Sequence, residues 1–200
     1  YDHFPGLLSA ALVNSILQAV YVYAASFHGK KLLALGGNSG NPIFDWFIGR
    51  ELNPRIGEFD IKTFNELRPG LILWALLDIS CVCHQYTKFG WVSDSIVLVT
   101  LFHLWYIVDS LINESTILTQ MDITTDGFGF MLSVGDLAWL PFTYCLQARF
   151  LAFHPIHLGW LGVLAILAVQ FTGYYIFRVA NLEKNEFRHG RNPKGTYTVR

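Results

Sequence analysis

Five long apolar windows constrain this chain more than any other feature of its sequence. They cover residues 5–27, 70–87, 92–112, 130–153 and 157–180. Each approaches the roughly 20 apolar residues that a helix needs to cross the hydrocarbon core of a bilayer. Asp78 and His84 interrupt the second window, and Asp136 and Pro141 interrupt the fourth. The alternation that marks barrel strands is absent. We therefore predict an all-α, polytopic membrane helix bundle with about five spans.

Composition agrees with a membrane protein and argues against other classes. Hydrophobic residues make up 52% of the chain and charged residues 14%. Because the net charge is only -1 and no basic face is concentrated, we expect no nucleic-acid binding through this segment. The three cysteines, Cys81, Cys83 and Cys145, lie inside apolar windows, where thiols are usually buried as small hydrophobic groups. Their spacing does not suit a zinc site, so no metal is predicted.

The basic residues predict which side each connector occupies. If all five windows cross, twelve of the 14 lysines and arginines fall on one side. These twelve lie between the first and second windows or from the end of the fifth window onward, and only Lys88 and Arg149 lie on the other side. Positively charged connectors tend to remain cytoplasmic. We therefore place residues 28–69 and the C-terminal segment on the cytosolic side.

Three carboxylates, Asp78, Asp109 and Asp136, fall within the apolar windows. Such groups are costly at bilayer depth and usually face a bundle interior or a wet cavity. Asp136 fits equally well near a span end. Tyr106, Asp109 and Asn113 are spaced to share one helix face, and Tyr106 beside an acid can donate a proton into an apolar pocket.

Basic residues recur where the last apolar window ends. Arg178, Lys184, Arg188 and Arg191 suit a phosphate-bearing ligand, because arginine forms bidentate contacts and lysine supplies a point charge. The same pattern is typical of a juxtamembrane tail that touches anionic lipid. Composition alone favours the tail.

Three segments then resemble a known family. They are "GNSGNPIFDWFIGRELNPRIGEFDIKTFNELRPGLILW", "MDITTDGFGFMLSVGDLAWLPFTYCLQARFL" and "TGYYIFRVANLEKNEFR". Together they span about residues 35–188 and are similar to the sterol reductases. "LNPRIG" followed by "FDIKTFNELRPG" is most similar to the delta(14) and lamin B receptor branch. The resemblance implies a membrane protein of the endoplasmic reticulum or nuclear envelope, with a sterol and the lipid bilayer as partners.

The resemblance also implies a reaction and site residues. The family protonates a sterol double bond and then delivers hydride from NADPH. Lys184 and Arg188 of "KNEFR" match the family's contacts to the cofactor phosphates, which reverses the preference for a simple tail. Tyr106 matches the candidate acid tyrosine, and Asp109 matches the acidic residue three positions later.

The chain also departs from the family pattern. It lacks the "SGWWG" and "RHPNYLGD"-like motifs that follow in the family, and it begins without Met. We therefore interpret residues 1–200 as the central part of one sterol reductase domain of about ten spans, and we expect the isolated chain to be inactive.

Other functions remain open at this level. The full-length protein can be a delta(7) or delta(24(28)) sterol reductase. It can also be a lamin B receptor-like anchor in the inner nuclear membrane, with lamina or chromatin contacts if an N-terminal module exists. A transporter would explain the intramembrane carboxylates, but no inverted repeat is visible.

The polar connector between the first two windows carries both signs of charge. Nine charged residues lie between Asn41 and Gly70. A mixed pattern favours internal ion pairs in an ordered loop over a lipid-binding basic patch. We predict a folded cytosolic cap over the sterol pocket, without a catalytic role.

Overall fold

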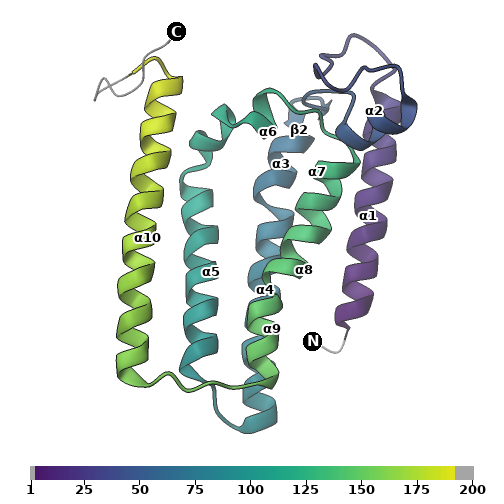
Figure 1. The fold of residues 1–200 in the computed structure, drawn as a ribbon. Helices are drawn as coiled ribbons and strands as arrows, with labels where there is room; N and C mark the ends of the chain where they lie inside the picture. Colours follow the sequence, from purple (N-terminus) through teal and green to yellow (C-terminus); the bar gives the residue numbers. More distant parts are fainter. Residues whose placement is uncertain (1–2, 192–200) are drawn as a thin grey trace.

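Long helices standing side by side dominate the computed structural model, which describes residues 3–191 (Figure 1). Within these residues, four helical segments are long and apolar enough to cross a bilayer. They are α1 (Phe4–Ala25), α3 with α4 (Ile61–Phe89), α5 (Asp94–Ile112) and α10 (Gly159–Arg188). In Figure 1 the chain passes up α1, down α4, up α5 and finally up α10. The all-α membrane bundle predicted from the apolar windows is confirmed.

The fourth apolar window forms a broken helix. Its parts are α7 (Phe130–Val134), the π-helical turn η2 (Gly135–Trp139), α8 (Leu140–Tyr144) and α9 (Leu146–Phe153). Pro141 explains part of the break, because proline has no N–H to donate to the carbonyl four residues earlier. Figure 1 shows the pieces descending beside α4 from the connector end to the opposite end. A fifth crossing in this window stays a prediction.

Helix α4 (Pro69–Phe89) is the centre of the bundle and packs against α5, α8 and α9. Apolar side chains of α3, α4, α5 and α8, together with Cys145, form the main core cluster. Its buried members are Leu67, Leu71, Trp74, Leu77, Ile107, Phe142 and Cys145. Gly70 lies so close to η2 that a Cβ there would overlap the backbone oxygen of Asp136. The break in the fourth window is therefore packed tightly against the start of α4.

The polar connector is folded. It contains α2 (Pro42–Ile48), the antiparallel pair β1 (Arg55–Ile56) and β2 (Phe59–Asp60), and α3 (Ile61–Leu67). Asn41 caps α2 by accepting from the N–H groups of Ile43 and Phe44. Asp60 caps α3 by accepting from Thr63 N–H at 2.9 Å. Asparagine and aspartate are strong caps because their oxygens satisfy the free N–H groups of the first turn.

Ion pairs tie the connector together, as its mixed charges predict. Lys31 pairs with Glu51 at 3.1 Å, and Arg55 pairs with Asp60 at 3.1 Å. Arg50 reaches back to α1, where it donates to the backbone oxygen of Ser26 at 2.6 Å. The connector is thereby held on the end of α1.

A second polar segment, residues 113–129, lies against the connector. It contains the 3₁₀ helix η1 (Glu114–Thr119) and α6 (Met121–Thr124). The backbone N–H of Phe128 donates to the oxygen of Glu51 at 2.9 Å. Figure 1 shows the connector, α6 and the C-terminal end of α10 at one end of the bundle. The basic segments therefore share one end, as the charge count predicts.

Candidate functional site

Tyr106, Asp109 and Asn113 lie on one face of α5 and line one cavity of about 140 Å³, called here the inner cavity. Apolar side chains, among them Leu71, Leu140 and Phe177, form part of its wall. Polar side chains from α3, α10 and the segment around η1 form the rest, and they include Glu66, Thr116, Gln120, Arg178 and Asn181. Tyr106, Asp109 and Asn113 therefore share one helix face, as their spacing predicts. That face borders a cavity that α10 also lines.

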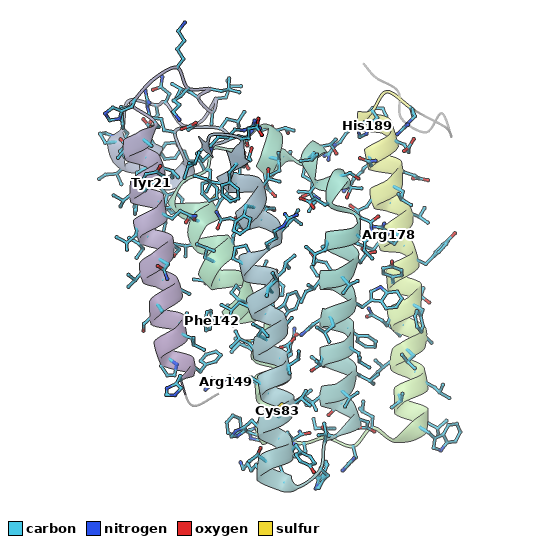
Figure 2. The ribbon with its side chains drawn as sticks, turned by 180° about the vertical axis from the view of Figure 1, so that it is seen from behind. Tyr21, Cys83, Phe142, Arg149, Arg178 and His189 are labelled. Atoms are coloured by element: carbon cyan, nitrogen blue, oxygen red, sulfur yellow. The ribbon has the colours of Figure 1, made fainter. Side chains whose placement is uncertain are left out.

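Asp109 is held by α10. Its Oδ1 accepts from the Tyr174 hydroxyl at 2.9 Å, and its Oδ2 accepts from Arg178 Nη1 at 3.3 Å. Asn113, one turn later on α5, also donates to Oδ1 at 3.2 Å. Figure 2 labels Arg178 on α10, nearer the end that carries His189. These bonds reach from α5 to two residues of α10, so the geometry supports Asp109 as an anchor between the two helices.

Apolar side chains line a cavity of about 330 Å³ between α5 and α10, called here the apolar cavity. Tyr106 and Asp109 belong to its wall as well as to the inner cavity. The remaining wall is mostly aromatic and aliphatic, with Phe102, Trp105, Val169, Tyr174 and Phe177. Tyr106 therefore stands at a boundary between a polar and an apolar space.

Lys184 and Arg188 line a third, polar cavity of about 200 Å³, called here the outer cavity. It lies between the end of α10 and the segment that contains η1 and α6. Both residues belong to the helix, which extends eight residues past the predicted span end at 180. Asn181 and Asn185 lie on the same helix face and add amide donors. The four side chains can satisfy several oxygens of a phosphate group.

The inner and outer cavities adjoin, because Thr116, Gln120 and Asn181 line both. The structure thus brings the predicted acid residues and the predicted cofactor contacts to one groove along α10. The sequence reasoning missed Glu66, which lines the inner cavity, and Tyr174, which binds Asp109 and lines the apolar cavity. Of these two residues, only Tyr174 could have been found from the sequence, because it shares the helical spacing of Arg178 and Asn181.

The other intramembrane carboxylates lie elsewhere. Asp78 on α4 is fully buried and its Oδ2 lies 2.6 Å from His103 Nδ1 on α5. Trp74 packs its ring against both His103 and Tyr106, with centroids 4.6 and 5.9 Å apart. Asp136 lies in the π-helical turn η2 and is 9% exposed. Asp78 therefore joins α4 to α5 through His103.

Comparison with known proteins places this arrangement in a family. The model of the Ergosterol biosynthesis ERG4/ERG24 family matches residues 1–199. The chain belongs to this family. It is 62% identical over 193 residues to the delta(14)-sterol reductase erg24 of Schizosaccharomyces pombe. It is 52% identical over 213 residues to the delta(14)-sterol reductase ERG24 of Saccharomyces cerevisiae. The resemblance drawn from the three sequence segments is confirmed.

The chain spans about half the length of these relatives. The matches cover 96% of this chain and 46% of the first relative, and 100% and 49% for the second. A relative from Ascobolus immersus, also named delta(14)-sterol reductase, is 55% identical over 94% of the chain and 45% of its own length. Its apolar helices and these relatives indicate a multi-pass membrane protein of the ERG4/ERG24 family.

Proposed function

We propose that the full-length protein reduces a sterol carbon-carbon double bond, the delta(14) bond, with NADPH as hydride donor. The observation that carries this proposal is the groove in which Tyr106 and the pair Lys184 and Arg188 line adjoining cavities. The names of the relatives support the delta(14) bond and favour an enzyme over a lamina anchor. We place the protein in the endoplasmic reticulum membrane because it belongs to a sterol biosynthesis family.

Tyr106 is the proton donor in this proposal. A double bond carries no charge, so its reduction by hydride requires prior or concerted protonation at one carbon. Tyr106 borders the apolar cavity, where a sterol ring fits, and also borders the polar inner cavity. The apolar cavity, about 330 Å³, lies within the roughly 300–1,000 Å³ typical of small-molecule pockets. A phenol at this boundary can protonate a sterol carbon while it stays connected to polar groups.

Lys184 and Arg188 hold the cofactor in this proposal. The outer cavity fits a phosphate group, because it offers two cationic side chains together with amide and hydroxyl donors. NADPH, when bound, supplies the hydride that completes the reduction. Asp109 keeps α10 against α5 through Tyr174 and Arg178, so the basic end of α10 stays aligned with Tyr106.

The test uses the full-length protein in membranes with a delta(8,14)-diene sterol and NADPH. The expected product is the delta(8) sterol, identified by mass spectrometry, with one NADPH consumed for each sterol reduced. Parallel reactions with delta(7) and delta(24(28)) sterols distinguish the other reductase branches. Absence of turnover with all three substrates would contradict the proposal.

A further inference from the structure

Glu66, near the end of α3, faces the same inner cavity as Tyr106. It belongs to the polar connector, to which the sequence assigned no catalytic role. The inner cavity therefore contains two carboxyl groups, Glu66 from the connector and Asp109 from α5. Only one of them is suited to carry a proton.

The two carboxyl groups have opposite surroundings. Asp109 accepts from both Arg178 and Tyr174 and forms an ion pair with Arg178. Over residues 3–191, by contrast, Oε2 of Glu66 is buried and accepts no hydrogen bond. A buried oxygen without a donor favours the neutral carboxylic acid over the carboxylate.

The basic residues beside Glu66 are engaged by other groups. The ammonium group of Lys62, one turn earlier on α3, is fully buried and donates to three backbone oxygens, those of Leu52, Ile123 and Asp126. An ammonium group has only three N–H donors, so none remains for Glu66. Arg68 forms two hydrogen bonds to Glu114, at 3.0 and 2.8 Å.

Two neighbouring carboxyl groups oppose ionisation of Glu66, whereas the charge of the buried Lys62 favours it. Asp122 on α6 and Asp136 on η2 both interact with it electrostatically, and α3 packs against η2. Oδ2 of Asp136 is also buried and accepts no hydrogen bond from any described residue. Across the cavity the charged groups are Asp109 and Arg178, which pair with each other. Like charges close together favour protonation of one member of the group.

Water can connect Glu66 to Tyr106. The inner cavity measures about 140 Å³, whereas a cavity needs only about 15 Å³ to hold one water. Polar side chains supply the partners that such waters need, including Ser110, Thr116 and Gln120. The adjoining outer cavity continues this polar space toward the end of the bundle that carries the connector. On its other side Tyr106 meets the apolar cavity, whose wall is mostly aromatic and aliphatic.

We propose that Glu66, as a carboxylic acid, returns a proton to Tyr106 after each reduction. This rests on the proposed function, in which Tyr106 gives its proton to the sterol. In the proposed step the O–H bond of Glu66 breaks, the proton passes through water, and an O–H bond forms on the Tyr106 phenolate. The Glu66 carboxylate then takes a proton from the solvent at the outer cavity. One proton from solvent is consumed for each sterol reduced, as the net reaction requires.

The experiment compares Glu66→Gln with wild type in full-length protein reconstituted in lipid nanodiscs. Proton transfer by a positioned group typically contributes about 100-fold or more, so kcat of Glu66→Gln should fall by about that factor. KM for NADPH should change less than about twofold, because the cofactor contacts are intact. The fall of kcat at high pH should also disappear, since glutamine does not titrate. Glu58→Gln is the matched control, because Glu58 is exposed in the same connector and should leave kcat unchanged.

A second readout does not depend on turnover. Infrared spectra should show a carboxylic acid C=O band in the wild type that disappears in Glu66→Gln. If that variant does not fold, Glu66→Asp keeps a titrating acid, and both its infrared band and its pH profile should shift. An unchanged kcat and pH profile in Glu66→Gln, or a wild-type spectrum without this band, would overturn the inference. Failure of the wild type to reduce any sterol would instead overturn the proposed function.

Discussion

Asp109 shows how the partners of a residue decide its role. From the sequence it was paired with Tyr106, three positions earlier, as part of the acid machinery. In the structure its oxygens accept from Tyr174 and Arg178, which lie 65 and 69 positions later. Arg178 had been counted with the basic segment at the end of the last window. The ion pair makes Asp109 a link between two helices, and its catalytic role stays a prediction.

Lys184→Ala should weaken NADPH binding in the full-length protein. A hydrogen bond to a charged group contributes about 1.5–3 kcal/mol, so KM for NADPH should rise by about 10- to 100-fold with kcat much less affected. Arg191→Ala is the matched control, since Arg191 lies near the same helix end but pairs with Glu186. Steady-state kinetics with NADPH as the varied substrate measures both. Equal KM values for the two variants would contradict the assigned phosphate contact.

Asp78→Ala should destabilise the bundle strongly. Asp78 is fully buried against His103, and removing one member of a buried pair typically costs about 3–5 kcal/mol. Arg55→Ala removes an exposed pair with Asp60 and should cost less than about 1 kcal/mol. Thermal unfolding of both variants in the same detergent compares the effects. A loss no larger for Asp78→Ala than for Arg55→Ala would show that the buried pair is not important for stability.

Among the elements, the connector is fixed by close backbone contacts. Gly37 and Gly127 both approach the carbonyl group of Gly49, at the end of α2, more closely than any side chain allows. Gly49 itself has φ of +102°, in a region that favours glycine. Three glycines therefore pin α2 to the segment that leads into α7, and this holds the connector over the bundle.

Gly37→Ala should loosen this junction, whereas Gly36→Ala should not. A Cβ on Gly37 would overlap the Gly49 oxygen, while a Cβ on Gly36 would meet no atom within 4 Å. Overpacking of this kind typically costs about 1–3 kcal/mol. Limited proteolysis of the connector, together with thermal unfolding, measures the difference between these adjacent positions. Similar protease sensitivity in both variants would contradict the proposed contact.

Asp45, in α2, makes the stability of the connector depend on pH. Burial by itself raises the pKa of its carboxyl, but hydrogen bonds from the hydroxyl and N–H of Ser39 and the N–H of Gly40, with the charge of Arg50, lower the pKa by more. The folded-state pKa thus lies below the ordinary value of 3.8. The contribution of the Asp45 carboxylate to stability is therefore fully present above the ordinary pKa, and it is lost as pH falls through the folded-state pKa.

Asp45→Asn provides the test of this dependence. At neutral pH the variant should unfold at lower temperature than the wild type, because the amide is a weaker acceptor for the three donors. The difference should shrink as the pH falls below about 4, where the wild-type carboxyl also becomes neutral. Thermal unfolding of both proteins across this pH range gives the comparison. A difference that does not vary with pH would exclude Asp45 as the titrating group.

At the scale of the whole molecule, the site depends on a helix that is only loosely packed within the described residues. None of the residues of α10 is buried. Hydrogen bonds to Asp109 connect it to α5, together with an edge-on contact between the rings of Trp105 and Tyr174, with centroids 5.4 Å apart. A few polar contacts therefore align the basic end of α10 with Tyr106.

The orientation of the bundle in the membrane gives a further prediction. Because most lysines and arginines gather at the connector end, that end should face the cytosol. Glu58→Cys and His154→Cys place single exposed thiols at opposite ends in a background without other reactive cysteines. In sealed microsomes, a membrane-impermeant maleimide should label Glu58→Cys at once and His154→Cys only after permeabilisation. The reverse pattern would invert the proposed topology.

The sequence by itself determined the class of this protein and most of its local structure. Apolar length predicted the helices, charge placement predicted a shared polar end, and helical spacing predicted that Tyr106, Asp109 and Asn113 share a face. These properties depend on near neighbours along the chain. Tertiary structure alone decided that Asp109 binds α10 and that Glu66 lines the same cavity as Tyr106. Those pairings join positions 40 or more residues apart, and no local periodicity encodes which distant helix supplies the partner.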